Sequence, residues 1–155
     1  MLIGLMMKMM NENYFLIIYT EDYEILIVKK KSIEKWEIPR ISSTKELPIR
    51  TLIDNYLQKY FTANFKIIGQ SEVIDKYEWP KELVSVTGKT GEEHRFILIK
   101  LESHFNNTNI NKDTDIESYD LVEYDILCNK VIFKNHRKVL WDVIQDVKKK
   151  EKKIS

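Results

Sequence analysis

The chain has 155 residues, of which 43% are hydrophobic, and this is enough apolar material for one ordinary core rather than two. Its 25 lysines and arginines nearly balance its 24 aspartates and glutamates, so the formal net charge is +1 and no overall field directs the chain to nucleic acid or to a membrane surface. The single cysteine, Cys128, excludes an internal disulfide and a multi-cysteine metal site, and we interpret it as a packing residue in a reducing compartment.

The first ten residues, MLIGLMMKMM, are too short and too poor in positive charge for a secretory signal. No apolar run reaches the roughly 20 residues that span a bilayer. We therefore expect a cytoplasmic protein without a membrane partner. Its loose N-terminal segment would be residues 1–13 and its single domain residues 14–147, followed by a solvated basic tail at residues 148–155.

The first half of the chain predicts a hairpin and then a helix. Residues 14–20 and 24–28 are short, β-branched and aromatic runs on either side of a polar turn, and residues 36–39 form an extended piece closed by a proline. From Pro48 the apolar spacing changes to that of one helical stripe, made of Ile49, Leu52, Ile53, Tyr56, Leu57 and Tyr60.

The second half predicts strands at residues 65–68, 83–87, 96–101 and 119–123, separated by turn material. A second helix is expected to begin near Asn135, which is a suitable cap, and to continue to Val147. The order of strands, helix, strands, helix, without repeats, favours an α+β domain in which a mixed β-sheet is sandwiched between α-helices.

Four separated pieces of the sequence resemble one family. They are WEIP at residues 36–39, YEWPKEL at residues 77–83, GEEHRFIL at residues 91–98 and VIFK at residues 131–134. In order and spacing they are similar to the Nudix hydrolases, within them to the bacterial RNA 5′-pyrophosphohydrolases and dinucleoside polyphosphate hydrolases. The resemblance covers most of residues 14–147 and implies a Nudix fold.

The family's signature, the Nudix box G-x5-E-x7-R-E-U-x-E-E-x-G-U with U an aliphatic residue, is degenerate in this chain. Arg40 and Ile41 follow the proline where the family has two glycines. If the helix is aligned with Leu57 at U, the Arg-Glu pair becomes Asn55 and Tyr56, the Glu-Glu pair becomes Lys59 and Tyr60, and the closing glycine becomes Thr62.

The missing glutamates carry the family's chemistry. They hold two or three Mg²⁺ ions, which neutralise the polyphosphate and generate the attacking hydroxide from bound water. Lys59 removes a ligand and adds a charge that repels a metal ion. The resemblance therefore implies that no metal binds at the inherited site and that no cofactor is to be expected there.

An alternative is that the catalytic acids have moved. Asp115 falls near a further metal-binding or base glutamate of the resembled branch, and Asp115 or Glu117 could hold Mg²⁺ or Mn²⁺ together with Asp54 or Glu46. This active form requires the four side chains to converge within coordination distance. Otherwise they are solvated loop and helix charges.

The substrate side keeps one of the two cations that face the polyphosphate in the resembled branch. Arg95 remains, whereas Glu93 replaces the lysine. Arg40, where the family has glycine, is a candidate replacement clamp because the planar guanidinium matches phosphate oxygens.

Three further residues are candidate ligand contacts. His94 could act as a base or phosphate donor, although a lone histidine at the start of a strand is more often a surface residue. Tyr77 and Trp79 could stack on a base, as aromatic residues do in nucleotide and RNA sites, although most aromatic residues in a chain of this composition belong to the core.

Three functional hypotheses remain open. The first is a Nudix-fold protein that has lost hydrolase activity and binds a nucleotide, an RNA 5′ end or a protein partner. The second is an active hydrolase of nucleoside or dinucleoside polyphosphates, or of RNA 5′ ends, with a rearranged metal site. The third is a fragment or subunit of a larger assembly, which it would contact through the basic tail at residues 148–153.

Overall fold

The structure is a computed structural model, and it describes residues 11–44, 46–78, 80, 82, 91–131 and 137–154. The strands are β1 (Asn11–Tyr19), β2 (Ile25–Lys30), β3 (Ile33–Glu37), β4 (Arg40–Ser42), β5 (Phe65–Glu78), β6 (Gly91–Leu101) and β7 (Ile116–Val122). The helices are α2 (Ile49–Tyr60), α4 (Tyr124–Lys130) and α5 (Arg137–Ile154), with the 3₁₀ turn η1 at Asn107–Asn109. None of the described helices is both long and apolar enough to cross a bilayer.

The strands form one mixed sheet in the order β3, β2, β1, β6, β5. The central pair, β1 and β6, is parallel, and the other pairs are antiparallel, including β4 on β1 and β7 on β2. The predicted hairpin is confirmed, since β1 and β2 are antiparallel with Tyr19 opposite Ile25.

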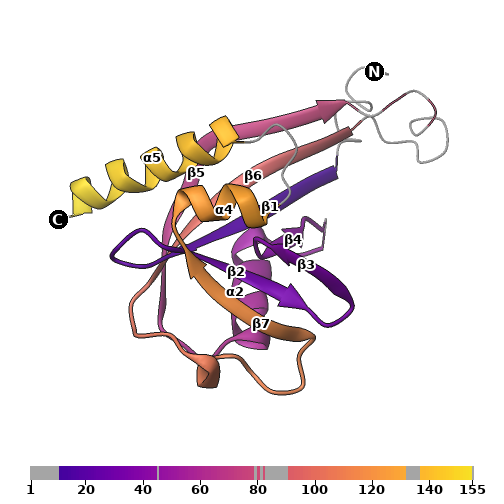
Figure 1. Ribbon diagram of the computed structural model, residues 1–155. Helices are drawn as coiled ribbons and strands as arrows, with labels where there is room; N and C mark the ends of the chain where they lie inside the picture. Colours follow the sequence, from indigo (N-terminus) through magenta and orange to yellow (C-terminus); the bar gives the residue numbers. More distant parts are fainter. Residues whose placement is uncertain are drawn as a thin grey trace.

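Helices cover both faces of the sheet, with α2 on one side and α4 and α5 on the other (Figure 1). The alternation of β1 explains this arrangement, because successive side chains of a strand point to opposite faces. Leu16 and Ile18 pack in the core under α2, whereas Ile17 and Tyr19 pack in the core under α5. The α+β fold class, with a mixed sheet between helices, is therefore confirmed.

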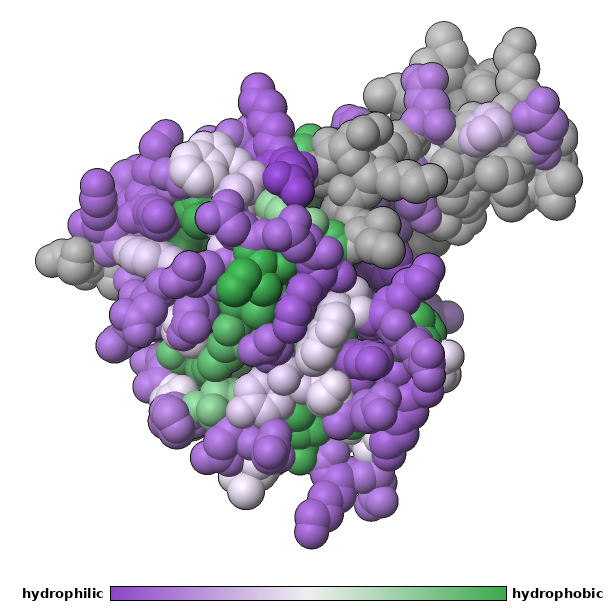
Figure 2. Space-filling view, viewed as in Figure 1, coloured by the Kyte–Doolittle hydropathy of each residue, from purple (hydrophilic) through white to green (hydrophobic). Residues whose placement is uncertain are grey.

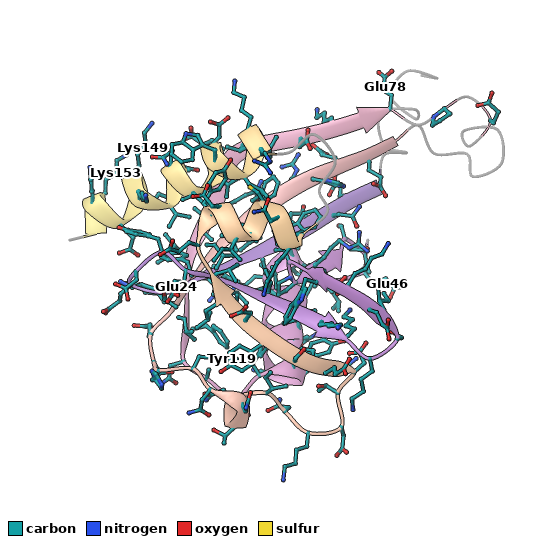
Figure 3. All side chains as sticks on the ribbon, in the orientation of Figure 1. Glu24, Glu46, Glu78, Tyr119, Lys149 and Lys153 are labelled. Atoms are coloured by element: carbon teal, nitrogen blue, oxygen red, sulfur yellow. The ribbon has the colours of Figure 1, made fainter. Side chains whose placement is uncertain are left out.

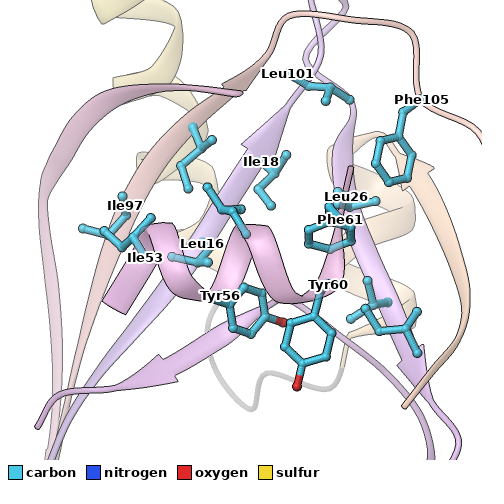
Figure 4. Close-up of a cluster of buried hydrophobic side chains, with 14 of the residues drawn as sticks. Leu16, Ile18, Leu26, Ile53, Tyr56, Tyr60, Phe61, Ile97, Leu101 and Phe105 are labelled. Atoms are coloured by element: carbon cyan, nitrogen blue, oxygen red, sulfur yellow. The ribbon is translucent and has the colours of Figure 1, made fainter. Parts of the chain in front are cut away.

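Two apolar cores hold the three layers together. The core under α2 includes the rings and aliphatic side chains drawn in Figure 4, and the core under α4 and α5 includes Phe96, Leu127, Leu140 and Val143. Outside these cores, hydrophilic side chains dominate the face seen in Figure 2, and apolar side chains form only small areas between them.

The ordered domain extends beyond residues 14–147 at both ends. Strand β1 begins at Asn11 and pairs with both β6 and β4, so residues 11–13 belong to the sheet. Helix α5 continues to Ile154 instead of ending at Val147, which makes residues 148–154 helical. Glu151 ties this last part to the sheet, because it accepts hydrogen bonds from the hydroxyl of Tyr19 at 2.6 Å and from Lys100 Nζ at 3.2 Å.

Strand β5 is much longer than the predicted residues 65–68. Its pairing with β6 is interrupted twice, which hides most of the strand from the sequence pattern. The register shifts between Ile67 and Gly69 and again between Gln70 and Ile74. Gly69 has a φ of 150°, a conformation that glycine adopts without strain. These irregularities break the period-two pattern from which a strand is recognised.

One helix of the structure was not predicted, and two predicted features lie outside the described residues. Helix α4 was not predicted, since its seven residues contain only one buried side chain, Leu127, and give no helical stripe. The strand expected at residues 83–87 and the cap expected at Asn135 lie outside the described residues.

Candidate functional site

Helix α2 occupies the place that the sequence resemblance assigns to the signature helix. It begins after Pro48, whose fixed φ suits a helix start, and it has no acidic residue in its first turn. Of its apolar stripe, the buried residues are Ile53, Tyr56, Leu57 and Tyr60. The predicted helix is confirmed, and the stripe faces the sheet.

A polar loop closes the C-terminal end of α2 in the absence of the family's glycine. The side-chain amide of Asn111 donates to the carbonyl oxygens of Gln58 at 2.8 Å and Lys59 at 3.0 Å, and its backbone N–H donates to Tyr60 at 2.9 Å. These carbonyls lack partners within the helix, so the loop satisfies groups that would otherwise be exposed to solvent. The contact also fixes the segment that leads to β7 against the helix.

Two tyrosines occupy positions aligned with the family's glutamates. Tyr56 and Tyr60 are 9% and 8% exposed, with ring centroids 4.5 Å apart, and Figure 4 shows the two rings side by side. Lys59, at the third of these positions, is exposed and its Nζ lies 5.0 Å from the centroid of the Tyr60 ring. In this chain these positions of the resemblance are thus filled by two packed aromatic rings and an exposed ammonium group.

Acidic side chains do surround this aromatic pair at longer range. Burial raises the pKa of the Tyr56 hydroxyl, and the charges of Tyr60, Glu37 and Asp115 raise it further. Glu37 itself forms an ion pair with Lys30 at 3.3 Å, and the backbone carbonyl of Asp115 accepts a hydrogen bond from Lys31 at 2.7 Å. The Tyr56 phenol therefore stays protonated and neutral.

These residues do not fit a divalent metal ion. Mg²⁺ prefers anionic or neutral oxygen ligands in octahedral geometry, whereas the aligned positions supply two phenols and one ammonium group. Across the described ranges, no three histidine, cysteine, aspartate or glutamate side chains gather closely enough to hold a metal. The donor set thus lacks the carboxylates on which the family's chemistry depends.

Among the described residues, no three of the four acids of the alternative active site form a cluster that could hold a metal ion. Glu46 is exposed in the segment before α2, and Asp54 pairs with Arg50 Nε at 3.5 Å on the surface of the helix. Glu117 lines a polar depression of about 460 Å³ beside β7, whereas Asp54 lines a different one of about 610 Å³ near the start of β5.

The predicted phosphate contact Arg95 is already neutralised within the protein. Glu93, which is only 7% exposed, accepts from Arg95 Nη2 at 3.0 Å and lies 3.9 Å from Lys76 Nζ. Beside them the hydroxyl of Tyr14 donates to Glu12 at 3.2 Å. Glu93 therefore engages two cations, Arg95 and Lys76.

Arg40 and Arg95 lie on opposite faces of the sheet, so they cannot form one clamp. Arg95 is opposite Tyr14 on the α2 side, whereas Arg40 is opposite Phe15, whose ring packs in the core under α5. His94 shares the face of Phe15 and Arg40.

His94 is buried rather than at the surface. It is 6% exposed, its ring lies edge-on to Phe15 at a centroid distance of 5.0 Å, and its Nε2 is 3.4 Å from a carboxylate oxygen of Glu92. The backbone of Tyr77 pairs with that of Glu92, but the Tyr77 side chain and all of Trp79 lie outside the described residues.

Comparisons with known proteins give a fold but no sequence family. No model of a protein family matches the sequence, and no curated protein sequence matches it either. Solved structures do match. The dihydroneopterin triphosphate pyrophosphohydrolase of E. coli has a TM-score of 0.63 and 11% identity, over 86% of this chain and 94% of that one.

Two further structures agree. A NUDIX hydrolase from Nitrosomonas europaea has a TM-score of 0.60 and 13% identity, over 86% of this chain and 88% of that one. The Ap4A hydrolase of C. elegans has a TM-score of 0.59 and 10% identity, over 86% of this chain and 94% of that one. The chain therefore has the Nudix fold, as the resemblance predicted.

Sequence reasoning missed two parts of this site. Asn111 was hidden in a loop rich in asparagine, and only the missing closing glycine at Thr62 could have indicated that another residue must complete the helix end. Lys30 and Glu37 come from separate strands, and their pairing depends on the β2 and β3 hairpin.

Proposed function

We propose that this chain is a Nudix-fold protein that has lost metal-dependent pyrophosphohydrolase activity and serves as a binding module for a nucleotide, an RNA 5′ end or a protein. The observation that carries the proposal is the buried pair Tyr56 and Tyr60, which fills the positions aligned with metal-binding glutamates. A carboxylate there would hold Mg²⁺, whereas a neutral phenol in an apolar core does not.

The substrate side supports the same proposal. The ion pairs of Glu93 with Arg95 and Lys76 leave less positive charge to hold a polyphosphate than a site with both cations unpaired. A polyphosphate would have to compete with a carboxylate that is already in place. We therefore expect weak recognition of the phosphate chain.

The alternative, an active hydrolase with a rearranged site, gains no support from the placement of the acids. Asp54 and Glu117 line different depressions. If activity nevertheless remained, it would need Mg²⁺ or Mn²⁺ held in part by Asp115, which is the acid nearest the family's position by resemblance.

Phosphorus NMR tests the proposal directly. The protein is incubated with a 5′-triphosphorylated RNA and with a dinucleoside tetraphosphate, first with Mg²⁺ and then with Mn²⁺, beside an active Nudix hydrolase. We expect intact substrate, and calorimetry should show no micromolar binding of Mn²⁺. Product that forms with this protein and disappears in Asp115→Ala, but not in the control Asp22→Ala, would overturn the proposal.

Binding is measured separately from hydrolysis. Affinity for a labelled dinucleoside tetraphosphate is compared between the wild type and Arg40→Ala, since Arg40 is exposed and its replacement does not disturb the core. A loss of at least fivefold would support Arg40 as a phosphate contact. Unchanged affinity would remove it from the site.

A further inference from the structure

Helix α5 presents a basic surface on the side of the sheet opposite α2. Its buried residues, among them Leu140, Val143, Ile144 and Val147, face the sheet. The opposite side of the helix, at the spacing of one helical face, carries Lys138, Trp141, Asp142, Gln145, Lys149, Lys152 and Lys153. We name these seven residues the outer face of α5.

The outer face is strongly cationic although the whole chain is nearly neutral. Its four lysines are exposed, and Asp142 is its one acid. Figure 3 shows two of these lysines, Lys149 and Lys153, near the C-terminal end of the helix. The outer face therefore carries a local excess of positive charge, four lysines against one aspartate.

The other two acids of α5 that follow Asp142, Asp146 and Glu151, make hydrogen bonds on the inner side of the helix. Glu151 accepts from Tyr19 and Lys100, and these bonds, with the nearby charge of Lys66, lower its pKa. Asp146 accepts from the hydroxyl of Ser71 at 2.7 Å. Both carboxylates thus hold α5 to the sheet.

The same outer face carries a large exposed aromatic side chain. Trp141 is 48% exposed and lies edge-on to Tyr124, with ring centroids 5.2 Å apart. The Tyr124 hydroxyl donates to the carbonyl of Arg137 at 2.7 Å, which links α4 to the start of α5. The indole is therefore held at the surface by a second ring.

We propose that the outer face of α5 binds single-stranded RNA, with its lysines on successive phosphates and Trp141 stacked on a base. Positive charge along the nucleic-acid backbone combined with an aromatic side chain that stacks on a base is the arrangement by which proteins hold single strands. Trp141 and Lys152 are eleven residues apart, which is about 16 Å along a helix and roughly five nucleotides at duplex spacing.

RNA fits this surface better than a lipid surface does. A helix that lies in a membrane buries its apolar face among the lipids, whereas the apolar face of α5 is already buried against the sheet. The inference depends on the proposed function in one respect, which is that RNA is chosen among the anionic polymers that such a surface could bind. It adds a second surface, separate from α2, that would hold the chain of an RNA.

The test is fluorescence anisotropy with a labelled twelve-nucleotide RNA bearing a 5′-hydroxyl, at 50 and 200 mM salt. The variant is the triple substitution Lys149→Glu, Lys152→Glu and Lys153→Glu. Its matched control, with the same change in charge at exposed sites elsewhere, is Lys31→Glu, Lys35→Glu and Lys112→Glu. Circular dichroism verifies that both variants are folded.

We expect the wild type and the control to bind, and the outer-face triple variant to lose at least tenfold in affinity. The slope of log K against log salt should fall by about 2, since each phosphate contact contributes about 0.7. Trp141→Ala should weaken binding by roughly fivefold or more with little change in the slope.

Three results would overturn the inference. They are an absence of RNA binding by the wild type, equal losses in the two triple variants, and loss of binding to phosphatidylserine vesicles in the outer-face variant while RNA binding persists. Because the RNA has no 5′-phosphate, the result is independent of hydrolysis. Hydrolysis in the phosphorus NMR assay would refute the proposed function, but it would leave RNA binding by the outer face of α5 to be decided by the anisotropy measurement.

Discussion

Asp146 fastens helix α5 to the irregular part of strand β5, and its removal should be costly. One of its carboxylate oxygens, Oδ2, accepts from the Ser71 hydroxyl at 2.7 Å and from the backbone N–H of Glu72 at 3.2 Å. Ser71 is only 2% exposed, so in Asp146→Ala its hydroxyl would lose this partner inside the protein.

The magnitude follows from the two bonds. A hydrogen bond to a charged group contributes about 1.5 to 3 kcal/mol, and the bond to the exposed Glu72 adds less than the bond to buried Ser71. We therefore expect Asp146→Ala to lower the free energy of unfolding by about 2 to 4 kcal/mol, a large part of the roughly 5 to 15 kcal/mol of an ordinary domain. The midpoint of thermal unfolding should fall by about 5 to 15 °C.

Urea denaturation followed by tryptophan fluorescence measures this loss. The matched control is Asp142→Ala, an aspartate on the outer face of the same helix, which should change stability by no more than about 0.5 kcal/mol. Asp146→Asn, which keeps one oxygen acceptor, should fall between the two. Equal stability of Asp146→Ala and Asp142→Ala would refute the role given to the carboxylate.

Three further predictions concern other contacts. The pKa of Glu151 is lowered by its hydrogen bond from Tyr19 and by Lys100, so its contribution to stability should be complete above about pH 5 and lost as the pH falls through the lowered pKa. Unfolding free energies measured across pH 3 to 6 should therefore depend less steeply on pH in Glu151→Gln than in the wild type, and equal slopes would contradict this. Asn111→Ala should cost about 1 to 2 kcal/mol in urea denaturation, because two carbonyls of α2 lose a donor; no loss would mean that the loop is held without it. Tyr56→Phe should raise the midpoint of thermal unfolding, because the buried hydroxyl has no hydrogen-bond partner in the described part of the chain, and a lower midpoint would contradict this.

The regular parts of the fold could be predicted from the sequence because local pattern and final packing agree there. The stripe from Ile49 to Tyr60 reads as a helix and packs as one, and the β1 and β2 hairpin follows from two apolar runs around a turn. Strand β5 could not be predicted in full, since Gly69 and the shifts beside it depend on the partner strand β6.

Some features of the candidate site could likewise be predicted from the sequence, and others could not. The sequence alone shows that Tyr56, Lys59 and Tyr60, at the positions which the resemblance assigns to metal ligands, are not carboxylates. The neutralisation of Arg95 by Glu93 could have been predicted from residues two apart on one strand, which share a face. That Arg40 lies on the other face could not, because it depends on the register of β4 against β1.

The aromatic pair under α2 also bears on how this protein could change over evolutionary time. A cluster of carboxylates is tolerable only when cations are bound, which couples the stability of such a protein to the supply of divalent ions. Tyr56 and Tyr60 remove that coupling. A glutamate at either position would bury a charge without the further carboxylates needed to hold a metal ion, so the single substitution Tyr56→Glu or Tyr60→Glu would lower stability. A metal site built on this helix would therefore need several acidic residues introduced together.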